Sequence, residues 1–155
     1  MELTFTRRWL GLHPDVHVLD AEGKEIYLFR GRWFAFLNRR YEMYDADGNH
    51  LVSVQEAFRF VNSEFVISRE GRLVCKAGLK NVVRHFAYVD PVGSPRLEIT
   101  FSGWTGLPKE IRASGKAVGE VRWKWDLKVT IKDEHGTPVN VAGLCAIYVI
   151  LTTNG

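Results

Sequence analysis

The chain ends with VAGLCAIYVILTTNG, Val141 to Gly155, and no side chain in this stretch is charged. Such a segment could be a membrane anchor, a further β-strand or a buried helix. The apolar part, Val141 to Leu151, is well short of the about 20 residues that a transmembrane helix needs. We therefore do not expect a membrane anchor.

The residues on both sides of this run favour a helix. Thr137 followed by Pro138 is typical of an N-cap and the first helical position, and Asn154 with Gly155 is typical of a helix end. The β-branched residues within Ile147 to Leu151 also favour a strand. We predict a helix from these ends, with a strand as the alternative.

A helix that is apolar on every side must be buried on every side. A closed antiparallel barrel can supply a lumen for such a helix, and small side chains would let barrel strands approach it closely. The segment contains four of them: Ala142, Gly143, Cys145 and Ala146.

The rest of the chain consists of short alternating runs separated by glycine-containing polar turns, which is typical of antiparallel β structure. The segments VLDAEGKEI, YDADGNHL, SREGRLV, ASGKAVGEV and KDEHGTPV each place a glycine, which adopts positive φ easily, between two extended runs. Many short strands with one polar face indicate a sandwich or a barrel.

The clearest strand pattern is EVRWKWDLKVTIK, Glu120 to Lys132, which alternates over its whole length. It is longer than a typical strand, so a tight turn near Asp126 that keeps the alternation is an open alternative. The inward residues predicted here are Val121, Trp123, Trp125, Leu127, Val129 and Ile131. Two similar runs predict Leu73, Cys75, Ala77 and Leu79, and Leu97, Ile99 and Phe101, on inward faces.

Composition places the chain among globular proteins. Hydrophobic residues make up 46% and charged residues 25% of the 155 positions, which fits one domain over residues 1–155. The net charge of +3 is too small and dispersed to indicate nucleic-acid binding. The start of the chain has no signal-peptide core, so we expect a cytoplasmic protein. Cys75 and Cys145 lie in apolar runs and are interpreted as reduced core cysteines rather than as a disulfide.

The order and spacing of several segments resemble the LURP-one-related proteins, which share the tubby C-terminal-like fold with phospholipid scramblases. These segments are VHVLDAEGKEIYLFRG, YEMYDADGNHLVSVQEAF, EFVISREGRLVCKAGLK, IRASGKAVGEVRWKW and the terminal VAGLCAIYVIL. The resemblance covers nearly the full length. It implies a closed antiparallel β-barrel of about twelve strands around a central hydrophobic C-terminal α-helix.

The resemblance implies less about activity. Tubby domains bind phosphoinositides, scramblase-like members are associated with membranes, and many LURP-one-related members have no defined activity. The chain has neither the proline-rich N-terminal region nor the membrane-inserting C-terminal extension of scramblases, so we do not expect lipid translocation.

No catalytic motif is present, and we expect a protein that is not an enzyme and needs no cofactor. His13, Asp15 and His17 would share one face of an extended strand and could bind a metal; we prefer a surface strand start shaped by Pro14, and predict no metal site. DADGNH lacks the spacing and the final glutamate of a calcium loop, which leaves a hairpin turn.

The functional hypothesis rests on basic residues that occur in pairs along the sequence. On outward strand faces they could hold lipid phosphates through charge-assisted hydrogen bonds, although solvated surface charge is the default interpretation. The candidate ligand-binding residues are Arg39, Arg40, Lys76, Lys80, Arg122 and Lys124. Trp9, Trp33 and Trp104 are candidate interfacial anchors or packing residues.

Three functions remain open at this point. The first is a non-enzymatic module that binds anionic phospholipid headgroups as a peripheral membrane protein. The second is a scaffold domain with a protein partner. The third, an enzyme with a dispersed site, is the least favoured because a central helix would fill the lumen that a barrel enzyme uses for its ligand.

Overall fold

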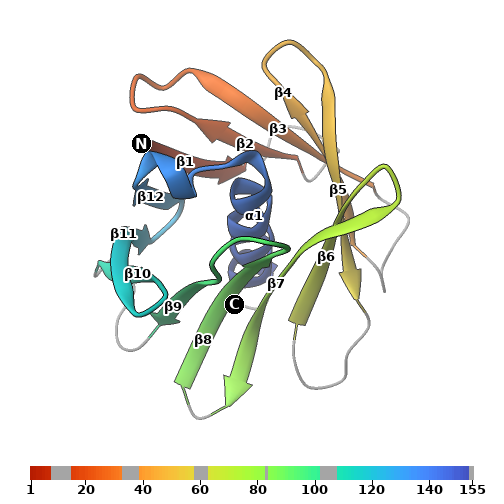
Figure 1. Ribbon diagram of the computed structural model, residues 1–155. Helices are drawn as coiled ribbons and strands as arrows, with labels where there is room; N and C mark the ends of the chain where they lie inside the picture. Colours follow the sequence, from red (N-terminus) through yellow and green to blue (C-terminus); the bar gives the residue numbers. More distant parts are fainter. Residues whose placement is uncertain (8–14, 33–38, 58–62, 83, 102–107, 154–155) are drawn as a thin grey trace.

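A computed structural model of the chain describes residues 1–7, 15–32, 39–57, 63–82, 84–101 and 108–153. These residues form twelve strands, a short 3-10 helix and one α-helix (Figure 1). The strands are Glu2–Arg7 (β1), Val16–Leu19 (β2), Glu25–Gly31 (β3), Arg40–Asp45 (β4), His50–Ala57 (β5), Ser63–Arg69 (β6), Arg72–Val82 (β7), Arg84–Pro91 (β8), Leu97–Phe101 (β9), Lys109–Ala113 (β10), Lys116–Trp123 (β11) and Leu127–Ile131 (β12). The helices are Asp133–His135 (η1) and Pro138–Thr153 (α1).

The sheet is a closed barrel in which each strand pairs antiparallel with its sequence neighbour. β1 closes the ring against β12, with Glu2 opposite Thr130 and Phe5 opposite Leu127. Closure leaves no strand edge unpaired in the ring, which removes the usual route to edge-to-edge aggregation. The predicted fold class, an antiparallel barrel with a C-terminal helix, is confirmed.

Two-residue turns with positive φ join two of the hairpins. Ser114 and Gly115 have φ of 51° and 76°, and Glu70 and Gly71 have φ of 51° and 77°. Positive φ at both central positions defines a type I′ turn, whose twist matches that of the flanking strands.

The DADGNH segment is a hairpin turn, as predicted. The Asp45 carboxylate accepts hydrogen bonds from the backbone N–H groups of Asp47 (3.0 Å) and Asn49 (2.9 Å). The Gly48 N–H donates to the Asp45 carbonyl oxygen at 3.1 Å. An aspartate side chain that satisfies its own turn in this way has a structural role.

The terminal segment is a helix, so the strand alternative is wrong. The Thr137 hydroxyl accepts a hydrogen bond from the backbone N–H of Asn140 at 3.2 Å, which is the geometry of an N-cap. Pro138 occupies the first helical position. Apart from Gly143, every residue from Asn140 to Ile150 is at most 3% exposed.

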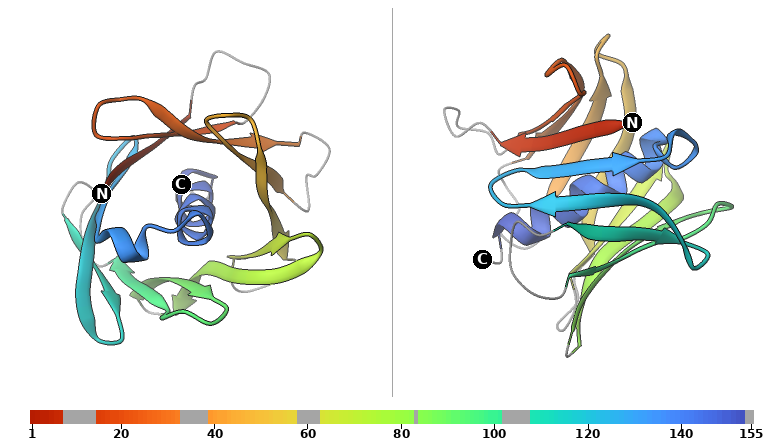
Figure 2. Two further views of the ribbon diagram at one scale, coloured as in Figure 1. Left: turned by 45° about the horizontal axis from the view of Figure 1, so that its top comes forward. Right: turned by 90° about the vertical axis from the view of Figure 1, so that its left-hand side faces the viewer.

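The helix lies inside the ring, with strands around it on all sides (Figure 2, left). It contacts β5, β6, β7 and β8 most closely. A Cβ atom on Gly143 would lie 2.4 Å from Cγ1 of Val89 on β8, so only glycine allows this approach. On the other flank, the rings of Phe5 and Tyr148 are 6.4 Å apart.

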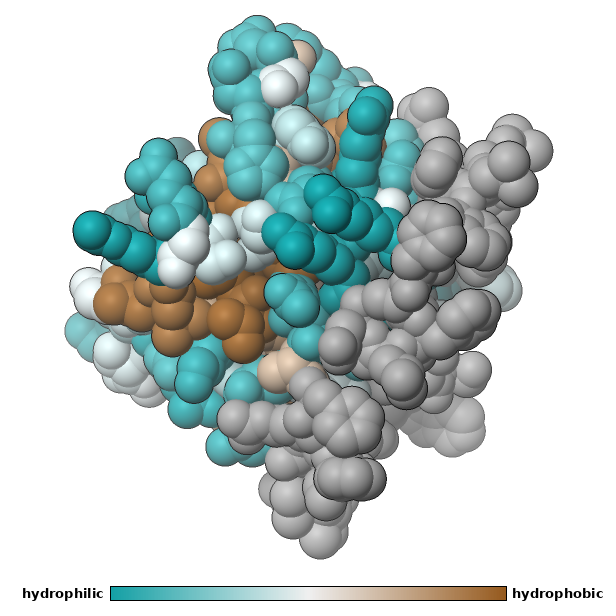
Figure 3. Space-filling model, turned by 90° about the vertical axis from the view of Figure 1, so that its right-hand side faces the viewer, coloured by the Kyte–Doolittle hydropathy of each residue, from teal (hydrophilic) through white to brown (hydrophobic). Residues whose placement is uncertain are grey.

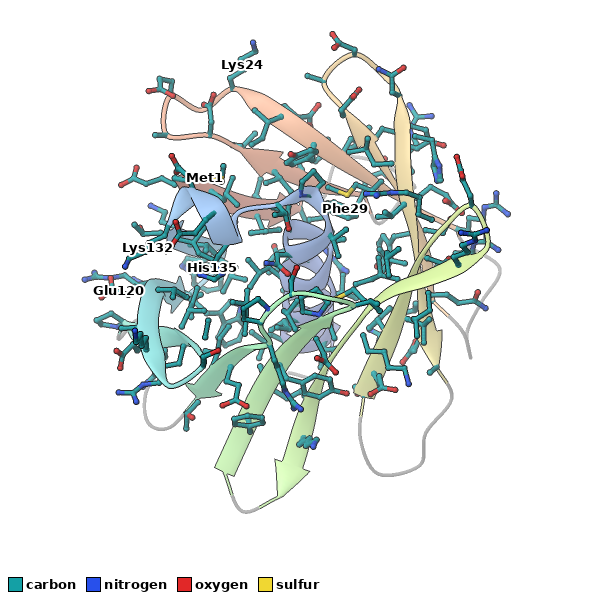
Figure 4. All side chains as sticks on the ribbon, in the orientation of Figure 1. Met1, Lys24, Phe29, Glu120, Lys132 and His135 are labelled. Atoms are coloured by element: carbon teal, nitrogen blue, oxygen red, sulfur yellow. The ribbon has the colours of Figure 1, made fainter. Side chains whose placement is uncertain are left out.

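Alternate side chains of each strand fill the space between wall and helix. Phe29 points from β3 toward α1, whereas Lys24 and Glu120 point away from the barrel (Figure 4). Leu97 and Ile99 are buried as predicted. The side chain of Phe101 lies outside the described residues.

Two inward predictions are wrong. Leu73 is 45% exposed because the pairing of β6 with β7 shifts by one residue between Ile67 opposite Cys75 and Ser68 opposite Leu73. Such a bulge reverses the face of the residues beyond it. Trp125 is 82% exposed because it lies in the turn between β11 and β12, whereas Trp123 is half-buried.

The outer surface around β5 and β6 is mostly hydrophilic, interrupted by an apolar band (Figure 3). Most outward side chains of these strands are polar, but Val66 on β6 is an apolar residue on the outer face. The surface around Trp125 belongs to another part of the ring.

Candidate functional site

The turn between β11 and β12 presents the most exposed large apolar side chain of the described residues. Trp123 pairs with Leu127, and Lys124, Trp125 and Asp126 form the connection. The Lys124 N–H donates to the Asp126 carbonyl oxygen at 3.2 Å. Phe5 lies opposite Leu127 and stacks near Tyr148 of α1, so this turn is at the end of the barrel where α1 ends (Figure 2, right).

Three exposed cations lie in the same hairpin as this tryptophan. Arg122 on β11 lies directly opposite Lys128 on β12, and Lys124 begins the turn. No ion pair joins any of the three to another residue in the described part of the chain. Like charges directly opposite each other on a sheet are unfavourable, so an external anion would stabilise this arrangement. Arg122, Lys124, Trp125 and Lys128 are called the basic hairpin below.

The acidic residues nearest this hairpin on the sheet lie further from the turn than Arg122 does, beginning with Glu120, which shares the outer face of β11 two residues before Arg122. Glu120 is opposite Glu110, and the Glu110 carboxylate accepts hydrogen bonds from Arg112 at 3.1 and 3.2 Å. Asp126, in the turn itself, is half-buried. The basic hairpin is thus a local concentration of positive charge on a chain whose net charge is only +3.

Arg39 and Arg40 are already engaged by carboxylates. The Arg39 guanidinium makes two hydrogen bonds to Glu56, from Nε at 2.8 Å and Nη2 at 3.0 Å. Arg40 Nε donates to Glu42 at 2.8 Å. A phosphate would have to compete with these carboxylates, so this pair offers little free charge to a ligand.

Lys76 and Lys80 lie on the outer face of β7. Lys80 Nζ is 5.5 Å from the centre of the Tyr88 ring, and Arg96 Cζ is 4.6 Å from the same ring. Tyr88 also donates a hydrogen bond to Glu64. Lys76 lies opposite Asp90. Lys76 and Lys80 thus lie in a surface region that contains carboxylates as well as cations, next to the buried Tyr88.

The six predicted ligand-binding residues therefore lie at three places around the ring. Strands β5 and β6 separate the β4 pair from the β7 pair, and β8, β9 and β10 separate β7 from β11. The structure places Arg122 and Lys124 near Lys128, which sequence reasoning did not select although its alternation put it outward. It also adds Trp125, which the same alternation wrongly assigned to the core.

A buried carboxylate organises the outer face of β4 and β5. Glu42 accepts hydrogen bonds from Arg40, from Ser53 at 2.6 Å and from His50 at 2.6 Å, and it is 8% exposed. Burial by itself raises the pKa of Glu42, but the hydrogen bonds from Ser53, His50 and Arg40 outweigh it and hold the pKa below its ordinary value. Glu42 therefore has a structural role, and its carboxylate is not a free acid.

We expect Glu42→Gln to reduce the free energy of unfolding near neutral pH by about 1 to 2 kcal/mol, because charged hydrogen bonds are replaced by weaker ones. A carboxyl whose folded pKa is lowered contributes stability above its unfolded pKa of about 4.3 and loses it as the pH falls through the folded pKa. The difference from wild type should therefore shrink below about pH 4. Urea unfolding across this range measures it, with Glu2→Gln, at an exposed position on β1, as the control for the same change of charge. A Glu42→Gln difference that stays constant with pH would contradict the assignment.

Two open depressions of about 360 and 380 Å³ lie on the outer face of β3 and β4 and share Arg30 and Tyr44. The Arg30 guanidinium lies 6.0 Å from the centre of the Tyr44 ring. Both depressions are outside the ring, and α1 occupies its interior. Neither has the enclosed, mostly apolar shape that is typical of a small-molecule site.

The possible metal-binding motif is only partly described. His13 lies outside the described residues, Asp15 accepts a hydrogen bond from the Gly31 N–H at 3.2 Å, and His17 pairs with Glu25. Among the residues that are described, no group of three or more potential ligands converges. Trp9, Trp33 and Trp104, the candidate interfacial anchors, also lie outside the described residues.

Both cysteines are free and buried. Burial raises the pKa of the Cys75 thiol to about 12 and also raises the pKa of Cys145. Because the thiolate is the nucleophile, neither group is prepared for covalent chemistry near neutral pH. The predicted core position of both cysteines is confirmed.

No helix among the described residues is both long and apolar enough to cross a membrane. A family model described as LURP-one-related matches residues 1–117. No curated protein and no solved structure matches the chain.

Proposed function

We propose a function for this chain on the premise that it belongs to the LURP-one-related family. The function is non-enzymatic binding of anionic phospholipid headgroups, through basic side chains on the outside of the barrel. A cytoplasmic protein that associates peripherally with membranes fits this function, because the cytoplasmic leaflet carries the anionic lipids.

The observation that carries the proposal is the arrangement of Arg122 and Lys128. They are opposite each other, exposed, and without a carboxylate partner in the described residues, and Lys124 adds a third charge at the same turn. Lipid phosphates accept charge-assisted hydrogen bonds from such groups. Each cation near an anionic membrane contributes about 1 kcal/mol, so the three together should provide about a hundredfold in affinity.

The interior of the barrel supports a binding module over an enzyme. The helix fills the lumen with side chains that are nearly all at most 3% exposed. Lipid-binding chemistry needs only an outer surface of the correct charge, which the barrel provides without opening its core.

Vesicle co-sedimentation tests the proposal. Wild-type protein should bind vesicles that contain phosphatidylserine or a phosphoinositide, bind pure phosphatidylcholine poorly, and release when salt rises from about 0.05 M to about 0.5 M. Reversing the three cations in Arg122→Glu, Lys124→Glu and Lys128→Glu should reduce the affinity by more than about a hundredfold, because the three attractive charges are lost and three repulsive ones are added.

The matched control reverses three exposed cations at the opposite end of the barrel, with Arg69→Glu, Arg72→Glu and Lys116→Glu. It has the same net charge as the hairpin variant and should keep most of the binding. Equal losses in the two variants would show that only net charge matters. Failure of the wild-type protein to bind anionic vesicles would reject the proposal.

A protein partner is the second candidate, favoured by two exposed apolar side chains. Leu73 is 45% and Val92 67% exposed, and the Val92 N–H donates to the Val74 carbonyl oxygen at 2.9 Å, which holds the two segments together. Recovery of one stoichiometric partner that Leu73→Ser with Val92→Ser abolishes, with no effect of lipid, would favour a scaffold over a lipid-binding module.

A further inference from the structure

We propose that the tip of the β11–β12 hairpin is the point of membrane entry, with the Trp125 side chain inserted between the headgroups of an anionic bilayer. The inference rests on the proposed lipid binding and goes beyond it, because it assigns an apolar anchor and an orientation. The barrel would dock on its end, with the end at which α1 terminates facing the lipid.

The first observation is the exposure of Trp125. It is 82% exposed, whereas Trp123, two residues earlier, is half-buried against the core. A tryptophan with this exposure buries little apolar surface in the fold, and its amphipathic ring is the group that is typical of membrane interfaces. The anchor therefore needs no rearrangement of the fold to reach a bilayer.

The second observation is the charge around this ring. Lys124 is adjacent in sequence, and Arg122 and Lys128 are paired at the base of the turn. Inserting the ring would bring these cations to the level of the phosphates. Apolar insertion and electrostatic attraction would then act at the same point, which is the combination that supports interfacial binding.

The acidic residue of the turn is less exposed than the three cations around it. Asp126 is half-buried, and its charge acts on Tyr148 of α1: burial raises the pKa of Tyr148 to about 12, and Asp126 adds to the increase. Val92, the next most exposed apolar residue, lies at the opposite end of the barrel, two residues after the exposed carboxylate Asp90.

The hairpin is also rigidly placed. Leu127, at the base of the turn, is fully buried, and its partner Phe5 on β1 packs near Tyr148. Because Leu127 anchors the base of the turn in the core, the orientation of the turn relative to the barrel is defined.

Fluorine NMR of protein labelled with 5-fluorotryptophan tests the insertion directly. The Trp125 resonance is assigned by its absence in Trp125→Phe. With phosphatidylcholine–phosphatidylserine vesicles, this resonance should broaden and become protected from a water-soluble paramagnetic quencher, and with pure phosphatidylcholine vesicles it should stay accessible. Protein that binds the anionic vesicles while Trp125 stays accessible would overturn the insertion and leave lipid binding intact. Absence of binding would overturn both.

A substitution gives an independent readout. Trp125→Ala should weaken binding to the anionic vesicles about tenfold, because a large apolar side chain no longer leaves water. Its thermal unfolding should match that of wild type, since the ring is exposed in the fold. Val92→Ala, at the opposite end, is the control and should bind as wild type does. Equal binding by Trp125→Ala and wild type would overturn the anchor.

Discussion

Removing residues 138–155 is expected to leave a chain with no cooperative unfolding transition. The deletion takes away α1, around which the inward side chains of the barrel pack. Six large side chains of the helix are at most 2% exposed: Val141, Leu144, Ile147, Tyr148, Val149 and Ile150. At about 1.5 to 3 kcal/mol each, their burial contributes up to about 9 to 18 kcal/mol, which is comparable to the whole net stability of a domain, about 5 to 15 kcal/mol.

A single substitution should approach the same result. Ile147→Asp places a carboxylate without a partner in a fully buried position, and burying an unpaired charge costs more than a domain of this size can offset. Trp125→Asp is the matched control, because it also replaces a large apolar residue by aspartate but at a position that is 82% exposed. Circular dichroism in the near and far ultraviolet during heating measures both.

The Trp125→Asp control should unfold at the same temperature as wild type. A truncated chain, or the Ile147→Asp variant, that keeps a sharp transition and native near-ultraviolet signal would show that the strands can close without the helix.

Much of the fold follows from local sequence. The type I′ turns need glycine at positive φ, and the polar and apolar alternation fixes which strand face is inward. The terminal helix follows from Thr137 and Pro138, although its core contains residues with high β propensity. Here burial inside a ring of strands outweighs the local preference, and only the apolar character on every side of the segment indicated such an environment.

The errors have one physical origin. Alternation assumes an unbroken pleat, but the bulge on β7 and the turn after Trp123 each interrupt it. The bulge depends on how β6 pairs with β7, which is tertiary information. The turn at Lys124 to Asp126 could be suspected from the length of the run, yet its three-residue form decides that Trp125 points to solvent.

For the same reason, only part of the candidate site could be predicted from the sequence. Whether an arginine can bind a ligand depends on which side chains lie next to it in the fold. Arg39 is held by Glu56 from the neighbouring strand, and Arg40 by Glu42, so the paired arginines of the sequence are neutralised. Arg122 and Lys124 gain a third cation only because β12 brings Lys128 opposite Arg122.

Replacing Gly143 by a larger residue should destabilise the protein strongly, because α1 lies close to β8 at this position. A Cβ atom there would lie 2.4 Å from Cγ1 and 3.0 Å from Cγ2 of Val89. Valine is stiff about χ1, so it cannot easily turn aside. We expect Gly143→Leu to lower the free energy of unfolding by about 3 kcal/mol, despite the better helix propensity of leucine.

A double-mutant cycle in urea separates this clash from a general effect on the helix. Val89→Ala alone should destabilise, because it leaves a cavity next to α1. In that background the vacated space accepts part of the new leucine, so Gly143→Leu should cost at least about 1 kcal/mol less than it does in wild type. Additive losses would mean that Val89 does not limit the approach. The close contact between α1 and β8 would then not be what requires glycine at this position, and the helix would have to sit farther from the wall than the structure places it.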